Sequence, residues 1–163
     1  MDIRSDVILK GNKWYNTIEK LAPFFKERTN YSIYILATSI GIMFDKRIED
    51  FEDGENPPKN VPRTVMLNHG SGRLDVMYEA AILSTNTVDY TEQQRLERAF
   101  GDDHVYRKLD FLTEFANYGV TELEKLIGDS ELATMENLRN FLNTSVEGTR
   151  CNIAADDILL EDY

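Results

Sequence analysis

The segment from Tyr31 to Phe44 carries no charged residue, in a chain in which 29% of all residues are charged. Its apolar side chains occupy one face at helical spacing, and two more, Ile35 and Ile42, lie well off that face. A helix that is apolar nearly all round is a central one, with other elements packed on several sides. At 14 residues it is too short to cross a bilayer, which needs roughly 20. The sequence therefore predicts a mainly α fold, a compact multi-helix bundle around a buried central helix at about residues 31–46.

One residue inside this segment predicts how it is packed, and the residue just before it predicts where the helix starts. Gly41 costs roughly 1 kcal/mol of helix propensity against Ala. Close approach of a neighbouring helix across Ala37, Thr38 and Gly41 would offset that cost. Asn30 is predicted to cap the helix, because its side-chain oxygen can accept from a free backbone N–H one turn in.

Apolar residues at helical spacing predict further helices on both sides of the central one. Pro23 lies within the first of them and predicts two short helices or a kink, since proline disrupts a helix interior. The segments are residues 14–25, 74–82, 92–100, 105–116, 121–127 and 132–142.

Local signals suggest where these helices begin and end. Thr91 with Gln94, and Thr121 with Glu124, match the capping box that opens a helix. Gly119 is predicted to be the left-handed residue that closes the helix before it. The helix after Thr91 is expected to bury one side, formed by Leu96, Ala99 and Phe100.

The stretch from Val61 to Leu67 is the only one with convincing β-prone character. It is followed by a turn rich in glycine, and the preceding loop contains two adjacent prolines. We therefore expect at most one short β-hairpin or extended arm near residues 61–72.

The length of 163 residues predicts a single helical domain over residues 1–150, followed by an acidic tail at 151–163. The lone Cys151 excludes an intramolecular disulfide and fits a cytoplasmic location. The net charge is -11, with 22 acids after residue 50, which disfavours non-specific DNA binding and favours basic protein surfaces as partners. No secretion signal or membrane-spanning segment is evident.

The turn around His69, Ser71 and Arg73 is the most suggestive candidate site. Its glycines, the helix that follows and the guanidinium suit an anion or a partner. The lysine of a Walker loop and the wider dinucleotide motif are missing, and Gly and Ser are ordinary turn residues. The segment is therefore a candidate partner or anion contact beside the plainer interpretation of a turn.

The remaining candidates carry less chemistry. Asp102, Asp103 and His104 resemble metal ligands, but adjacent helical residues diverge, and acids in a first turn suit the helix dipole. Cys151 has no neighbour that would lower its pKa. The acidic tail is a docked terminal segment, a short recognition peptide or a solvated segment; its candidate contacts are Asp156, Asp157, Glu161 and Asp162. We predict no catalytic, cofactor-binding or metal-binding residue, and no enzyme.

Several segments in order resemble DNA phosphorothioation-associated protein 4, a family of small accessory proteins encoded with Dnd-type sulfur-modification and restriction systems. The likeness spans roughly residues 30–127 and excludes the helix from Glu131 and the tail. Tyr118 departs from the family, which tends to have a small residue there. The similar segments are Ile35–Gly41 with Lys46–Arg47, Val61–Arg63, Met77–Leu83, and Phe111–Gly119 leading into Leu123. The resemblance implies a role in anti-phage defence and no active-site residue.

Three functions follow as hypotheses. The first is a non-enzymatic accessory or regulatory subunit of a bacterial anti-phage defence system, binding a larger, DNA-handling protein through its acidic face. The second is an acidic DNA mimic that inhibits a DNA-binding enzyme. The third is a small-ligand or nucleotide sensor that uses residues 69–73. Whether the chain forms a homo-oligomer stays open.

Overall fold

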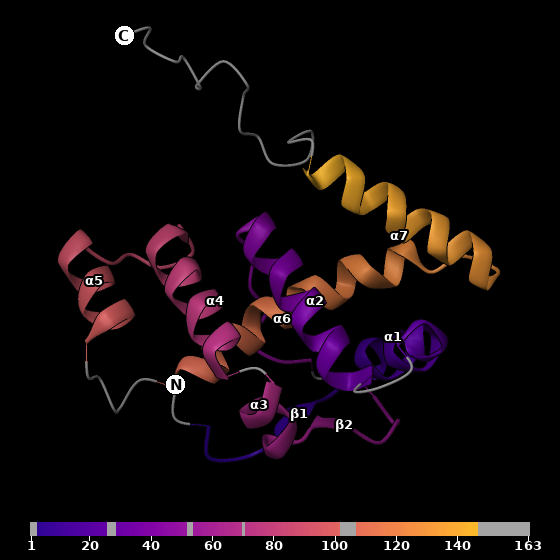
Figure 1. Cartoon of the computed structure of the whole chain (residues 1–163), viewed down its shortest axis with the longest axis horizontal. Helices are drawn as coiled ribbons and strands as arrows, with labels where there is room; N and C mark the ends of the chain where they lie inside the picture. The colour runs from indigo at the N-terminus through magenta and orange to yellow at the C-terminus, as the bar shows by residue number, and fades with distance from the viewer. Residues whose placement is uncertain (1–2, 26–28, 52–53, 70, 102–106, 147–163) are drawn as a thin grey trace, which may run out of the picture. The chain divides into compact units, whose positions relative to one another are not determined.

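The computed structural model describes residues 3–25, 29–51, 54–69, 71–101 and 107–146. It divides into two compact units, residues 1–124 and 125–163, which are described separately. A single domain over residues 1–150 therefore stays a prediction. The described residues form seven α-helices and a two-stranded sheet, so the predicted mainly α fold is confirmed (Figure 1). The helices are α1 Asn12–Leu21, α2 Thr29–Phe44, α3 Arg63–His69, α4 Ser71–Ser84, α5 Glu92–Phe100, α6 Lys108–Leu126 and α7 Glu131–Val146.

The uncharged segment forms α2, the central helix of the first unit. Ile33, Tyr34 and Ala37 are wholly shielded from solvent, whereas Ser39 on the opposite side is exposed. Asn30 is not its N-cap, because the helix already includes Thr29. Instead the Asn30 amide donates a hydrogen bond of 2.8 Å to the backbone oxygen of Asn60, so a distant strand takes up the side chain.

Helices α2 and α6 cross at two glycines (Figure 1). A methyl group on Gly41 would lie 2.6 Å from the carbonyl carbon of Phe115, and closer still to its oxygen. One on Gly119 would lie 2.6 Å from the carbonyl carbon of Ala37. The predicted close approach at Gly41 is therefore confirmed, because α6 passes at main-chain contact there.

The same crossing corrects two predictions about the end of a helix. Gly119 does not close a helix but is buried inside α6, which continues to Leu126. Thr121 accordingly opens no capping box; its hydroxyl donates to the carbonyl oxygen of Tyr118 at 2.7 Å, within the same helix. Asn-Tyr-Gly resembles a helix C-terminus locally, yet here the glycine serves the contact with α2.

Helix α1 ends where proline disturbs it. Trp14, Ile18 and Leu21 are buried along one side, as the spacing predicted. After Leu21 the chain turns into a short 3-10 helix, η1 Ala22–Phe24, with Pro23 in its first turn. The predicted break at Pro23 is thus confirmed.

The sheet joins segments far apart in the sequence. Strand β1 Val7–Leu9 pairs antiparallel with β2 Lys59–Val61, and Val7 lies opposite Val61. The expected extended arm from Val61 to Leu67 is wrong beyond Val61, because Arg63–His69 is the helix α3. The Asp6 carboxylate accepts from the Arg63 backbone N–H at 2.8 Å and satisfies one of the free donors of that helix.

The second unit contains the last residues of α6 and the helix α7. Ser130 caps α7, because its hydroxyl accepts from the Ala133 backbone N–H at 3.1 Å. The Thr134 hydroxyl accepts from the Gly128 backbone N–H at 3.0 Å, and the Asn137 amide donates to the Leu126 oxygen at 3.1 Å. Two side-chain contacts therefore tie the turn before α7 to the helix itself.

Candidate functional site

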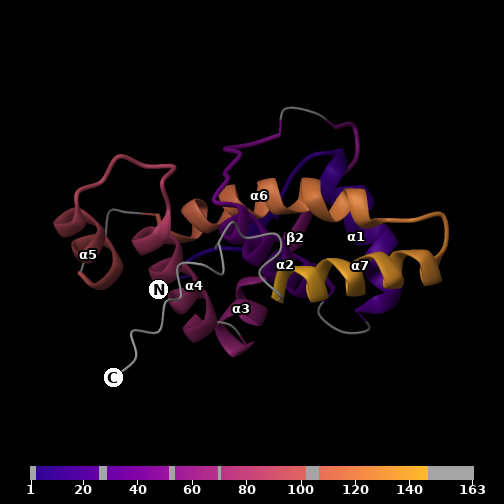
Figure 2. The same ribbon diagram turned by 90° about the horizontal axis from the view of Figure 1, so that it is seen from above.

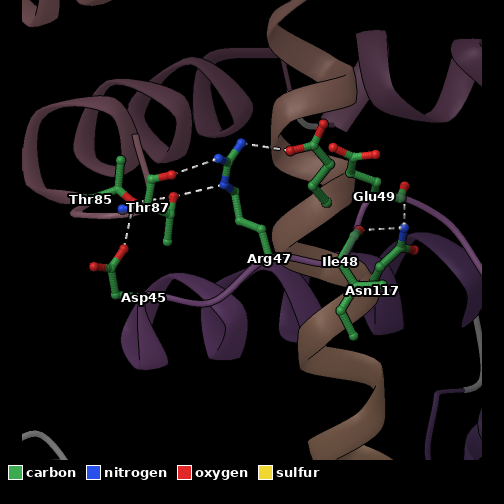
Figure 3. A network of polar contacts seen from close by, with 8 residues as sticks. Asp45, Arg47, Ile48, Glu49, Thr85, Thr87 and Asn117 are labelled. Carbon is green, nitrogen blue, oxygen red and sulfur yellow. Dashed lines mark hydrogen bonds and ion pairs between the residues drawn. The ribbon is translucent and has the colours of Figure 1, made fainter. Parts of the chain in front are cut away.

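A polar network surrounds the segment that follows α2 (Figure 3). It begins at Asp45, whose φ of 49° is left-handed. The Lys46 N–H donates to the Gly41 oxygen at 3.2 Å and the Asp45 N–H to the Ile42 oxygen at 3.0 Å, which is the Schellman pattern. Asp tolerates this conformation better than most residues do, so it can end α2 where glycine is usual.

The Asp45 carboxylate holds the loop that follows α4. One oxygen accepts from the Thr85 hydroxyl, and the other accepts from the Asn86 backbone N–H at 2.8 Å. The Thr85 and Thr87 hydroxyls are 2.7 Å apart. The residue that ends α2 therefore also fixes the start of the loop after Ser84 (Figure 3).

Arg47 lies at the centre of the network. Its guanidinium donates to the Glu114 carboxylate at 2.6 Å and to the hydroxyl and carbonyl oxygens of Thr87 at 2.7 and 3.1 Å. It also lies over the rings of Phe111 and Phe115, 4.8 and 5.8 Å from their centroids. Because only 20% of the Arg47 side chain is exposed, this contact is a half-buried ion pair stacked on aromatic rings.

Burial raises the pKa of the Glu114 carboxyl, and this desolvation is the largest influence on it. The positive charge of Arg47 lowers the pKa of Glu114, whereas the negative charge of Glu49 raises it. The net direction is upward despite the ion pair, so the environment disfavours the charged carboxylate.

Asn117 connects three parts of the first unit and is nearly shielded from solvent. Its side-chain oxygen accepts from the Trp14 indole N–H at 2.8 Å. Its amide donates to the backbone oxygens of Ile48 and Glu49 at 3.1 and 3.2 Å (Figure 3). One buried amide thus joins α1, the segment after α2, and α6.

Arg95 of α5 holds the other side of the 85–90 loop. Its guanidinium donates to four backbone oxygens between 2.6 and 3.3 Å away, those of Ile82, Thr85, Val88 and Tyr90. The Thr91–Gln94 capping box predicted from the sequence is confirmed by both of its hydrogen bonds. Together these contacts fix α5 and the loop before it.

The network is built for structure. Its charged groups pair with one another, with threonine hydroxyls or with backbone atoms. Among the described residues no three side chains of the metal-ligating types lie together. What it does is hold the 85–90 loop and α5 in place against the end of α2.

The surface of α5 corrects the predicted buried side of this helix. Only Ala99 is buried; Leu96 is 47% exposed and Phe100 is 65% exposed. Helix α4 packs against α5 (Figure 2). It leaves Val76 64% exposed as well. The positioned loop thus presents a helix whose largest apolar side chains are in solvent.

The residues proposed from the sequence as contacts fall largely elsewhere. His69 ends α3 and Ser71 begins α4, so helices flank the predicted turn on both sides; the side chains of these two residues lie outside the described part. Arg73 is exposed on α4. Asp102, Asp103, His104 and Cys151 lie outside the described residues, as do the tail acids Asp156, Asp157, Glu161 and Asp162.

Three residues that organise the network were not predicted as such. Arg47 follows directly after the uncharged segment, together with Lys46. This position was the feature of the sequence that could have pointed to its role. Asn117 lies in the predicted helix end at Gly119, and no sequence pattern singled out Arg95. Their partners are up to 103 residues away, so spacing along the chain does not reveal them.

No helix within the described residues is long and apolar enough to span a bilayer. Comparison of the chain with protein-family models, with curated proteins and with solved structures gives no match.

Proposed function

We propose that this chain is a non-enzymatic accessory subunit that acts by binding a larger protein. The observation that carries the proposal is the exposure of Leu96 and Phe100 on a helix held rigidly by Arg95. Exposed apolar side chains on a fixed element are typical of partner surfaces, because covering them with a partner lowers the free energy of the complex.

The polar residues of the first unit support the same conclusion. Arg47, Glu114 and Asn117 are occupied by internal contacts that hold helices together. Such groups stabilise a scaffold, and the hydrogen bond from the Thr85 hydroxyl to the Asp45 carboxylate likewise holds a loop. A binding function therefore suits this arrangement better than a catalytic one.

The resemblance to DNA phosphorothioation-associated protein 4 supports a narrower proposal. The similar segments include Gly41, Arg47 and Gly119. We infer that the chain serves a bacterial anti-phage defence system of the DNA modification and restriction type. Its partner there would be a DNA-handling protein, and it would work in the cytoplasm.

Affinity purification of the full chain from its native host tests this function. The expected result is co-purification of a nuclease, ATPase or DNA-modification enzyme, identified by mass spectrometry. The same purification from a strain that lacks the gene for this chain gives the background. Recovery of no DNA-handling protein would contradict the proposal.

Duplex DNA added to the recovered complex separates the accessory role from the DNA-mimic hypothesis. An accessory subunit remains bound while the partner binds DNA. Release of this chain by competing duplex would instead favour the acidic mimic.

A further inference from the structure

The basic and the acidic side chains of α5 have different surroundings. Arg95 points to the backbone oxygens of the preceding loop, and Arg98 lies over the Tyr90 ring at 4.6 Å. Glu92 and Glu97 are exposed instead. The basic residues of this helix are therefore engaged with the protein, while its acidic residues face solvent.

The exposed apolar residues lie beside these acids. Glu92, Leu96 and Phe100 follow one another at intervals of four residues, which places them on one side of the helix. Glu97 lies three residues before Phe100 and is therefore its neighbour on the helix surface. Its carboxylate accepts from the Gln93 amide at 2.8 Å. The outer side of α5 thus combines two large apolar groups with two negative charges.

This surface is preorganised. The capping box fixes the first turn of α5, and Arg95 ties the helix to the loop before it. Binding of a partner would therefore cost little conformational entropy in α5.

We propose that the outer side of α5, formed by Glu92, Leu96, Glu97 and Phe100, binds an amphipathic helix of the partner that carries Lys and Arg beside its apolar stripe. Helix recognition of this kind uses apolar anchors spaced three or four residues apart, with complementary charges at the edges. The proposal rests on the proposed function, because it names the partner surface of the same accessory subunit.

Charge complementarity selects this occupant over two others. A second copy would bring Glu92 and Glu97 against the same acids, and like charges disfavour that pairing. The segment 155–163 of this chain contains two acidic pairs and is disfavoured for the same reason. A basic helix meets the opposite charge at each of these positions.

Binding of a defined probe to the full chain tests the surface. The probe is a fluorescein-labelled 18-residue peptide of Leu and Lys in an amphipathic helical pattern; a second peptide carries Glu in place of every Lys. Fluorescence anisotropy gives the Kd at low and at physiological salt. We expect the basic peptide to bind, with salt weakening it, and the acidic peptide not to bind.

Paired variants locate the binding. Leu96→Ser with Phe100→Ser should weaken the basic peptide at least about tenfold, as loss of central anchors does. Glu92→Gln with Glu97→Gln should weaken it and flatten its salt dependence. The matched controls on α7 are Leu132→Ser with Leu142→Ser, and Glu131→Gln with Glu136→Gln, which alter the same number of exposed apolar and exposed acidic residues.

Several results would overturn the proposal. The surface is wrong if the α7 controls lose as much affinity as the α5 variants, or if the α5 variants bind like the wild type. The proposal is also wrong if the peptide shifts amide resonances of the wild type only at residues other than 92–100. This measurement needs no variant. Light scattering could instead show that the wild type is a dimer and that Phe100→Ser is a monomer. The surface would then bind a second copy of this chain, and the proposed partner helix would be wrong.

The complex from the native host separates this inference from the function on which it rests. If a DNA-handling protein co-purifies equally with the Leu96→Ser, Phe100→Ser variant, the accessory role stands and the α5 surface is wrong. If none co-purifies while the basic peptide still maps to α5, the surface stands and the proposed function fails.

Discussion

Gly41 of α2 lies against the main chain of Phe115 in α6, with no room for a side chain between them. One turn along each helix the contact is repeated in reverse, because Gly119 of α6 lies against the main chain of Ala37. Four residues separate the two members on each helix, which is the spacing of one helix face. The crossing therefore depends on two missing side chains.

Replacing either glycine by alanine should separate the helices. We expect Gly41→Ala to lower the free energy of unfolding by about 1–3 kcal/mol through overpacking. Urea denaturation followed by circular dichroism measures it. Gly72→Ala is the matched control, since nothing lies within 4 Å of a methyl group there, and it should stabilise α4 by about 0.5–1 kcal/mol. An unchanged midpoint for Gly41→Ala would refute the main-chain contact.

Asn117→Ala should destabilise the first unit by about 1–3 kcal/mol, because it leaves the buried Trp14 indole N–H without its acceptor. Trp14 is the single tryptophan, so its fluorescence reports the unfolding directly. Asn16→Ala, at an exposed position on α1 of the same unit, should change stability by less than about 0.5 kcal/mol. Equal effects of the two variants would argue against the role of Asn117 in joining the helices.

Arg95→Lys should loosen the loop of residues 85–90. A lysine ammonium cannot reach four carbonyl oxygens at once, so some of these partly buried acceptors lose their donor. We expect faster amide hydrogen exchange in this loop and a loss of about 1–3 kcal/mol in stability. Arg73→Lys, at an exposed position on α4, should leave both unchanged. Exchange that stays as slow in Arg95→Lys would mean that Asp45 and Arg47 hold the loop without Arg95.

Glu114 predicts a pH dependence with a definite sign. Its pKa is raised above the ordinary 4.5, chiefly by burial, so the native state holds this proton more tightly than the unfolded chain does. The contribution is fully present below pH 4.5 and is lost as the pH rises through the raised folded value. The wild type should therefore lose stability relative to Glu114→Gln from acid to neutral pH.

Urea midpoints of both proteins across this pH range measure that difference. Glu136→Gln, an exposed acid on α7, is the control and should follow the wild type in parallel. A wild type that gains stability over Glu114→Gln as the pH rises would show that the attraction of Arg47 exceeds the cost of burial.

Local patterns predicted the parts of the fold that depend on chain neighbours. The uncharged run predicted α2, the proline predicted the break after α1, and Thr91 with Gln94 predicted the capping box. Gly41 predicted the close helix contact, because glycine inside a buried helix is costly unless another helix needs the space.

Other features were decided only by residues distant in the sequence. The sequence around Gly119 predicted a helix end, but the residue is a contact point with Ala37 inside α6. The β-prone residues favoured an extended chain where Arg63–His69 forms a helix. Leu96 and Phe100 follow the apolar pattern of a buried side, yet the neighbouring helix covers only Ala99 between them.

By itself, then, the sequence determined a helical chain with a central apolar helix, because periodicity and capping act within a few residues. The tertiary structure decided how Asn117 and Arg95 are used and which apolar residues stay exposed. The physical reason is that burial and hydrogen bonding depend on what arrives from elsewhere in the chain, such as the Trp14 indole at Asn117.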